Sequence, residues 1–186
     1  MAKKIFIIGP VRDIGSELMN RIGDYVKKLE KNGCEVHWPA RDTDQNDPIG
    51  LQICLTNGSK IFESDEIHIW FDPSSKGSLF DRAMLCSFLF HGSKKKIVII
   101  NQTDFSPTEL FDLESEIDRA RNILSNEIIN LEFIPDDPGS LFTFGLFFGW
   151  TKILGLEKKL VVTNLEKLQP TPKKSFVNVI LALLNQ

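Results

Sequence analysis

The first residues able to do chemistry lie in a loop directly after an apolar run. The run over residues 5–8 ends at Gly9-Pro10, and Arg12 follows two residues later. Gly9 allows close backbone approach, Pro10 fixes the chain, and the planar guanidinium of Arg12 suits a phosphate or a carboxylate. A helix predicted to begin near Ser16 adds free N–H groups and a dipole that favour an anion. The loop therefore predicts an anion-binding turn, with a tight turn and a solvated arginine as the alternative.

A second polar loop follows another apolar run. Asp72 ends the run over residues 66–71, and Asp81 lies one turn inside a helix predicted to begin at Ser78. Between the two carboxylates, hydroxyl groups and open backbone amides are supplied by Ser74, Ser75, Gly77 and Ser78. A carboxylate at position 81 can act as a nucleophile on a sugar carbon or as a general base. The alternative is a capping box, because Ser78-x-x-Asp81 has the spacing in which the carboxylate only satisfies helix N–H groups.

A doubly wound parallel sheet would bring these two loops together. Strands are predicted at residues 5–8, 35–38, 66–71 and 96–101, and helices at 16–31, 48–62 and 78–91. Alternating strands and helices with short crossovers favour an α/β sheet of about five strands in the order 2-1-3-4-5, with helices on both faces. Strands one and three are then neighbours, and ligands bind beyond their carboxyl ends, where the strand order reverses.

The remainder of the chain is interpreted as part of the same domain, which spans residues 1–186. No repeat or linker divides it, and the pattern predicts helices at 109–130, 140–154 and 174–184 with strands at 131–134 and 160–163. The Phe-rich stretch from Phe142 to Trp150 is interpreted as core, with a contact between copies of the chain as the alternative. His37 and His68 lie in strand patterns and are interpreted as satisfied core or edge residues.

Composition and charge exclude several classes of function. The 186 residues carry a net charge of −3, which disfavours a broad nucleic-acid surface but leaves room for a pocket that binds one phosphate. Cys34, Cys54 and Cys86 lie far apart in apolar runs without metal-ligand spacing. They predict buried thiols in a reducing compartment, and we expect no metal and no cofactor. Neither a leader peptide nor a membrane span is indicated, so a cytoplasmic location is expected.

Together the two loops resemble those of a known family. Residues 5–10, the segment Ser64-Asp65-Glu66 and the run from Ser75 to Asp81 are similar to motifs of the nucleoside 2-deoxyribosyltransferase-like superfamily, over roughly residues 4–101. That superfamily includes deoxyribosyltransferases and nucleoside 5′-monophosphate N-glycoside hydrolases, and its fold is flavodoxin-like. The resemblance implies cleavage or transfer at an N-glycosidic bond, in which a glutamate attacks the anomeric carbon. By position that glutamate falls on Asp81, and Asp72 is expected to face the sugar or base.

The resemblance is nearer to the monophosphate hydrolases at two positions. Ser75 stands where the transferases carry an acidic residue and the hydrolases a phosphate-binding serine, and Arg12 matches an arginine of the hydrolases. The implied partner is a nucleoside or nucleotide, with no nucleic-acid polymer and no membrane. A homo-oligomer is also implied, since family members often complete the site with a neighbouring subunit. The implied substrate-binding residues are Gly9, Pro10, Arg12, Ser75, Gly77 and Ser78.

The sequence departs from the family pattern at the reacting carboxylate. Aspartate is one methylene shorter than glutamate, roughly 1.5 Å of reach, and a misplacement of about 1 Å can cost on the order of a hundredfold in rate. This departure favours an alternative function, a nucleotide-binding or sensing module without catalysis. Arg82 replaces a small residue next to Asp81, where it pairs with a phosphate, lowers the proton affinity of Asp81, or lies at the surface. A receiver or flavodoxin domain is disfavoured, because Gly9-Pro10 supplies neither clustered acids nor a hydroxyl-rich phosphate loop.

Overall fold

A four-stranded parallel sheet organises the first half of the chain. The structure, a computed structural model, describes residues 2–12, 14–106 and 110–185. The sheet contains β1 (Lys4–Ile8), β2 (Glu35–His37), β3 (Glu66–Ile69) and β4 (Lys96–Ile99) in the order β2-β1-β3-β4. Ile5 of β1 pairs with Val36 on one side and with Glu66 on the other. The predicted α/β class and the order of the first four strands are confirmed, consistent with a flavodoxin-like fold.

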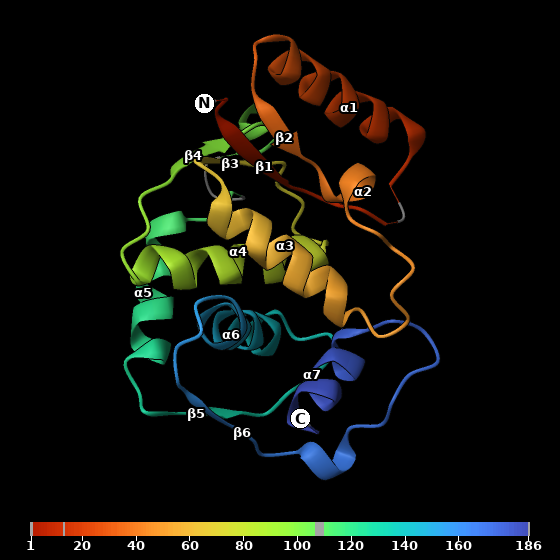
Figure 1. The fold of residues 1–186 in the computed structure, drawn as a ribbon. Helices are drawn as coiled ribbons and strands as arrows, with labels where there is room; N and C mark the ends of the chain where they lie inside the picture. Colours follow the sequence, from red (N-terminus) through yellow and green to blue (C-terminus); the bar gives the residue numbers. More distant parts are fainter. Residues whose placement is uncertain (1, 13, 107–109, 186) are drawn as a thin grey trace.

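Helices cover both faces of this sheet, as Figure 1 shows. α1 (Ser16–Lys31) lies on one face, and α3 (Leu51–Glu63) and α4 (Lys76–Phe90) lie on the other. Alternation along β1 explains the two-sided burial: Ile5 and Ile7 belong to the apolar cluster under α1, whereas Phe6 and Ile8 belong to the cluster under α3 and α4.

The second half of the chain adds a layer instead of a fifth strand to the main sheet. It comprises α5 (Leu113–Leu124), β5 (Ile128–Leu131), α6 (Pro138–Phe148), β6 (Lys159–Val162) and α7 (Phe176–Leu184). β5 pairs in parallel with β6 in a separate two-stranded sheet, on the side of α6 away from the main sheet (Figure 1). The expectation of a fifth strand beside β4 is therefore wrong. α6 is apolar on almost every side, so it is covered by α4 on one side and by β5 on another.

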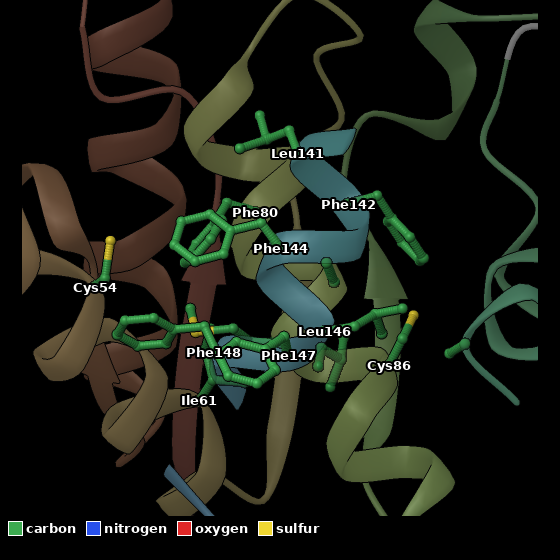
Figure 2. Close-up of a cluster of buried hydrophobic side chains, with 14 of the residues drawn as sticks. Cys54, Ile61, Phe80, Cys86, Leu141, Phe142, Phe144, Leu146, Phe147 and Phe148 are labelled. Atoms are coloured by element: carbon green, nitrogen blue, oxygen red, sulfur yellow. The ribbon is translucent and has the colours of Figure 1, made fainter. Parts of the chain in front are cut away.

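The packing of α6 on α4 forms the centre of the larger core (Figure 2). The ring of Phe80 on α4 lies 5.5 Å from the rings of Phe144 and Phe148, centroid to centroid. A Cβ at Gly145 would lie 2.7 Å from the Cβ of Ala83, so only glycine permits this helix approach. The interpretation of the Phe-rich stretch as core is confirmed for Phe142, Phe144, Phe147 and Phe148, which are all buried.

Short elements complete the chain and shift several predicted boundaries. α2 (Pro39–Asp42) lies between the strand predicted at 35–38 and the helix predicted at 48–62, and Pro39 takes its first helical position. The expected helix over 109–130 is shorter, and its last residues form β5. Single helical turns occur at Gln102–Asp104, Gly149–Ile153 and Leu165–Lys167. Within the described ranges, no helix is long and apolar enough to span a bilayer.

Candidate functional site

A cavity of about 530 Å³ opens beyond the carboxyl ends of β1 and β3. This is the position at which the strand order reverses and where ligands bind in doubly wound folds. The loops after the two strands, α3 and the start of α7 contribute its walls. The cavity brings together most of the residues predicted as a site from sequence, namely Gly9, Pro10, Arg12, Asp72, Ser75, Gly77 and Asp81.

Asp81 lies in the wall of this cavity, in the second turn of α4. The helix begins at Lys76, and the hydroxyl of Ser75 accepts a hydrogen bond from the backbone N–H of Ser78. The capping-box alternative for Asp81 is therefore wrong, because Ser75 caps the helix and Asp81 lies too far inside it. Only 6% of Asp81 is exposed, and Asn57 Nδ2 donates to its Oδ2 over 3.3 Å. Burial raises the pKa of Asp81 from 3.8 to about 7, and the hydrogen bond from Asn57 opposes this change.

The two serines that were predicted to bind substrate have different places. Ser75 lines the cavity, whereas Ser78 is 1% exposed and is absent from the described part of the cavity wall. The hydroxyl of Ser78 donates to the hydroxyl of Ser75 over 2.8 Å. Ser78 therefore does not line the described cavity, and it positions the hydroxyl group of Ser75, which does.

Asp72 is half-buried and begins the turn that leads into α4. Its Oδ1 accepts hydrogen bonds from the backbone N–H of Ser74 over 2.9 Å and from the Ser74 hydroxyl over 2.7 Å. Both bonds use the same carboxylate oxygen. Within the described chain no donor is bonded to the other oxygen, so Asp72 keeps one acceptor for a ligand.

Besides Lys76, which pairs with Asp136, the described cavity wall contains two further cations, Arg12 and Lys174. Lys174 precedes α7 and donates a hydrogen bond to the backbone oxygen of Gln45. Burial, and then the positive charge of Arg12, lower the pKa of Lys174. Within the described ranges neither cation forms an ion pair with a carboxylate, so the cavity has positive charge available for an anion. Sequence reasoning missed Lys174, because no local pattern shows that the segment before α7 lies beside loops more than 90 residues earlier in the chain.

α3 contributes a second pair of residues that sequence reasoning missed, Cys54 and Asn57. Helical spacing in the sequence could have identified Asn57. It lies on the buried face of α3, which consists of residues 54, 57, 58 and 61, and it is the residue of this face with a side-chain amide. A polar residue on an apolar stripe requires a partner, which here is Asp81. Burial, and then the nearby Asp81, raise the pKa of the Cys54 thiol, which keeps it protonated.

Several candidates lie outside the cavity. Arg82 is 6% exposed and pairs with Glu116 over 3.0 Å, with its guanidinium over the rings of Phe71 and Phe111. All three interpretations of Arg82 are therefore wrong, because it faces α5 as part of a buried ion pair. His68 is confirmed as a satisfied core residue, bonded to Glu66 over 3.0 Å and to the Tyr25 hydroxyl over 2.9 Å.

Besides the paired Lys76, the arrangement offers a buried acid, a second carboxylate and two cations around one cavity, so it can bind an anion next to a group that exchanges protons. The residues that the structure describes contain no group of three or more His, Cys, Asp or Glu side chains placed to hold a metal ion. Comparison of the chain with protein-family models, with curated proteins and with solved structures finds no match.

Proposed function

We propose that the cavity cleaves the N-glycosidic bond of a nucleoside or a nucleoside 5′-monophosphate, by hydrolysis or by transfer. The observation that carries the proposal is Asp81, a buried carboxyl group in the cavity wall whose pKa is raised to about 7. A group that titrates near neutral pH is suited to nucleophilic or acid–base catalysis. The resemblance of the two loops to the nucleoside 2-deoxyribosyltransferase-like superfamily agrees with this choice of bond.

In the proposed reaction the ionised carboxylate of Asp81 attacks the anomeric carbon of the sugar. A bond forms between a carboxylate oxygen and this carbon, while the bond to the base nitrogen breaks and its electron pair leaves with the base, which takes up a proton from water. Water then attacks the sugar ester in hydrolysis, or a second base attacks it in transfer, and the carboxylate of Asp81 is released. Asp72 accepts a hydrogen bond from the sugar through the carboxylate oxygen that the turn leaves open.

The charges around the cavity support a phosphorylated substrate. Arg12 and Lys174 supply two positive charges, and Lys76 and Gly77 place the N-terminus of α4 in the same wall. Guanidinium groups and helix N-termini both favour phosphate. The volume of about 530 Å³ lies within the range of roughly 300–1,000 Å³ in which proteins bind small molecules. We therefore expect nucleoside 5′-monophosphates to react faster than nucleosides at equal, low concentration.

The test is release of free base, followed by chromatography. The protein is incubated with ribo- and deoxyribonucleosides and with their 5′-monophosphates, beside Asp81→Asn and Asp24→Asn. Asp24 is an exposed residue of α1 that pairs with Lys27, so its variant is a matched loss of one carboxylate. We expect base from the parent and from Asp24→Asn but not from Asp81→Asn. Equal release by Asp81→Asn and the parent would overturn the proposal.

The second candidate function is nucleotide binding without catalysis. It is favoured by the short side chain at position 81, which is 6% exposed and is bonded to Asn57. A ligand that binds the native state raises the midpoint of thermal unfolding by mass action. Stabilisation by a nucleotide without any product in the same sample would select this function over the first.

A further inference from the structure

A chain of hydrogen-bonded polar side chains, buried except for the half-buried His37, runs from β2 to Asp81 in the cavity wall. His37 Nε2 lies 3.0 Å from Thr43 Oγ1, and Thr43 Oγ1 lies 2.9 Å from Asn57 Oδ1. Asn57 Nδ2 then reaches Asp81 Oδ2 over 3.3 Å. Thr43, Asn57 and Asp81 are each at most 6% exposed, so water does not compete with the Thr43–Asn57 and Asn57–Asp81 bonds. The chain thus joins β2, the segment after α2, α3 and α4 at one carboxylate.

The direction of every hydrogen bond in this chain follows from the ionised state of Asp81. A carboxylate only accepts, so Asn57 must present its NH₂ group to Asp81 and its carbonyl oxygen to Thr43. Thr43 has one hydroxyl hydrogen, which it donates to Asn57. Its oxygen therefore accepts from His37, which must carry hydrogen on Nε2. Burial lowers the pKa of His37 and so favours the neutral ring with hydrogen on one nitrogen only.

We propose that His37, Thr43 and Asn57 are positioning residues that favour the ionised form of Asp81 in the cavity, by fixing the NH₂ group of Asn57 toward the carboxylate. Without Thr43 the Asn57 amide is free to turn over and present its carbonyl oxygen to Asp81. That arrangement accepts only a protonated carboxyl group, which would donate to it. Loss of the chain therefore shifts Asp81 toward its neutral form. The effect on catalysis rests on the proposed function, whereas the effect on the protonation of Asp81 does not.

Other charged groups face the two ends of the chain and are the same in the variants proposed below. Around the cavity that contains Asp81 they are Arg12 after β1, Asp72 after β3, Cys54 of α3, Lys76 at the start of α4 and Lys174 before α7. Burial keeps the Cys54 thiol protonated and uncharged. The pKa of Asp81 is shifted by its burial and by the hydrogen bond from Asn57, and the groups around the cavity are unchanged when Thr43 is replaced.

Around His37 the charges come from α2 and α3. Arg41 and Asp42 lie 2.7 Å apart, and Lys60 and Glu63 lie 2.9 Å apart, nitrogen to oxygen. Each cation is next to an anion, so their effects on His37 largely cancel. Burial is then the main influence on its protonation.

The experiment is an NMR titration of the Asp81 side-chain carboxyl carbon between pH 4 and pH 9, in the parent and in Thr43→Val. Valine has the shape of threonine but no hydroxyl group. We expect the Asp81 midpoint to rise by about half a pH unit to one unit, the effect of one lost hydrogen bond. We expect ¹⁵N shifts of the parent to show hydrogen on Nε2 of His37. In kinetics, the acidic limb of the kcat profile should move by the same amount while KM is unchanged.

Two further variants control the titration. Thr151→Val also removes a half-buried hydroxyl, which donates to the Phe147 carbonyl oxygen within its own helix, and should leave the Asp81 midpoint unchanged. Thr43→Ser keeps the hydroxyl and should restore the parent midpoint. An unchanged midpoint in Thr43→Val, or hydrogen on Nδ1 of His37 in the parent, would overturn the inference. A shifted midpoint in a protein that releases no base would retain the inference and reject the proposed function.

Discussion

Two buried carboxylates at opposite ends of the same sheet differ in how their charge is balanced. Glu66 begins β3, with 7% of the residue exposed, and pairs with Lys3 over 2.8 Å and with Lys96 over 3.4 Å. Hydrogen bonds from Lys3 and then His68 lower its pKa from 4.5 to about 2. Asp81 is 6% exposed at the other end, where its partner is the neutral amide of Asn57 and its pKa rises to about 7.

The contrast lies in what opposes burial: cations and His68 do so for Glu66, whereas only the neutral amide of Asn57 does so for Asp81. Glu66 forms ion pairs with Lys3 and Lys96, which stabilise its ionised form. It therefore has no proton to exchange near neutral pH. Among the described residues Asp81 has no cation paired with it, although Arg12 and Lys174 line the same cavity. A buried carboxyl group without a cationic partner lowers the stability of the folded protein. Proteins keep such groups mainly where a ligand or a reaction uses them.

The largest expected effect is on catalysis. Asp81→Asn should lower the rate of base release by roughly 10²–10⁴-fold, since the reacting carboxylate is lost. Glu66→Gln should change the rate by less than about threefold, because Glu66 lies at the other end of the sheet and acts on stability. Initial rates at pH 7 for both variants and the parent provide the measurement. Similar losses in the two variants would remove the contrast between the two carboxylates.

The next effect concerns stability: Asp81→Asn, which should lower the rate, should raise the free energy of unfolding at high pH. The folded protein holds the proton of Asp81 up to about pH 7, whereas the unfolded chain releases it near 3.8. Parent stability should therefore fall as the pH rises from about 4 to about 7 and then level off, by up to about 4 kcal/mol from this group. Asp81→Asn should lack this fall and be the more stable protein at pH 8. Urea unfolding at pH 4.5, 6 and 8 tests this, and a difference that does not change with pH would contradict it.

A smaller effect is expected at the cations of the cavity. Lys174→Met should raise KM for nucleoside 5′-monophosphates by about tenfold, the typical effect of one lost charged hydrogen bond, and leave KM for nucleosides unchanged. Lys173→Met is the matched control, since Lys173 is exposed and is absent from the described wall of the cavity. An equal rise in KM for both substrate classes would mean that Lys174 does not bind a phosphate.

The smallest effect is expected at Glu66. Glu66→Gln should lower the free energy of unfolding at pH 7 by about 1–2 kcal/mol, since its charged hydrogen bonds are lost while Lys3 and Lys96 remain exposed to water. The lowered pKa means that Glu66 contributes its full stability above pH 4.5 and loses it as the pH falls through about 2. The two proteins should therefore converge in stability toward pH 2 in denaturant titrations. A constant difference over this range would assign the loss to packing instead of charge.

The part of the site built from neighbouring strands was predictable from sequence. Apolar runs ending at Gly9 and Asp72 identified β1 and β3, and alternation with helices gave the strand order that joins their loops. Helix α1 was predicted with its observed bounds, Ser16–Lys31. These features depend on local periodicity and on a topology rule, both of which a single sequence contains.

The parts built from distant segments were not predictable. Lys174 reaches the cavity because α7 packs back on α3, and no periodicity encodes such a return. β5 joins β6 because the apolar α6 needs cover on a second side, which is a tertiary requirement. The role of Asp81 was ambiguous, since Ser75 and Ser78 both have a hydroxyl suited to capping, and only the observed start of α4 at Lys76 distinguishes them.

The most direct test of the account is a titration of both carboxylates in the parent protein, by NMR of side-chain carboxyl carbons from pH 1.5 to pH 9. The account predicts a midpoint of about 7 for Asp81 and about 2 for Glu66, in one molecule and one series of spectra. An Asp81 midpoint at or below about 4 would contradict it, because Asp81 would then be an ordinary satisfied carboxylate like Glu66.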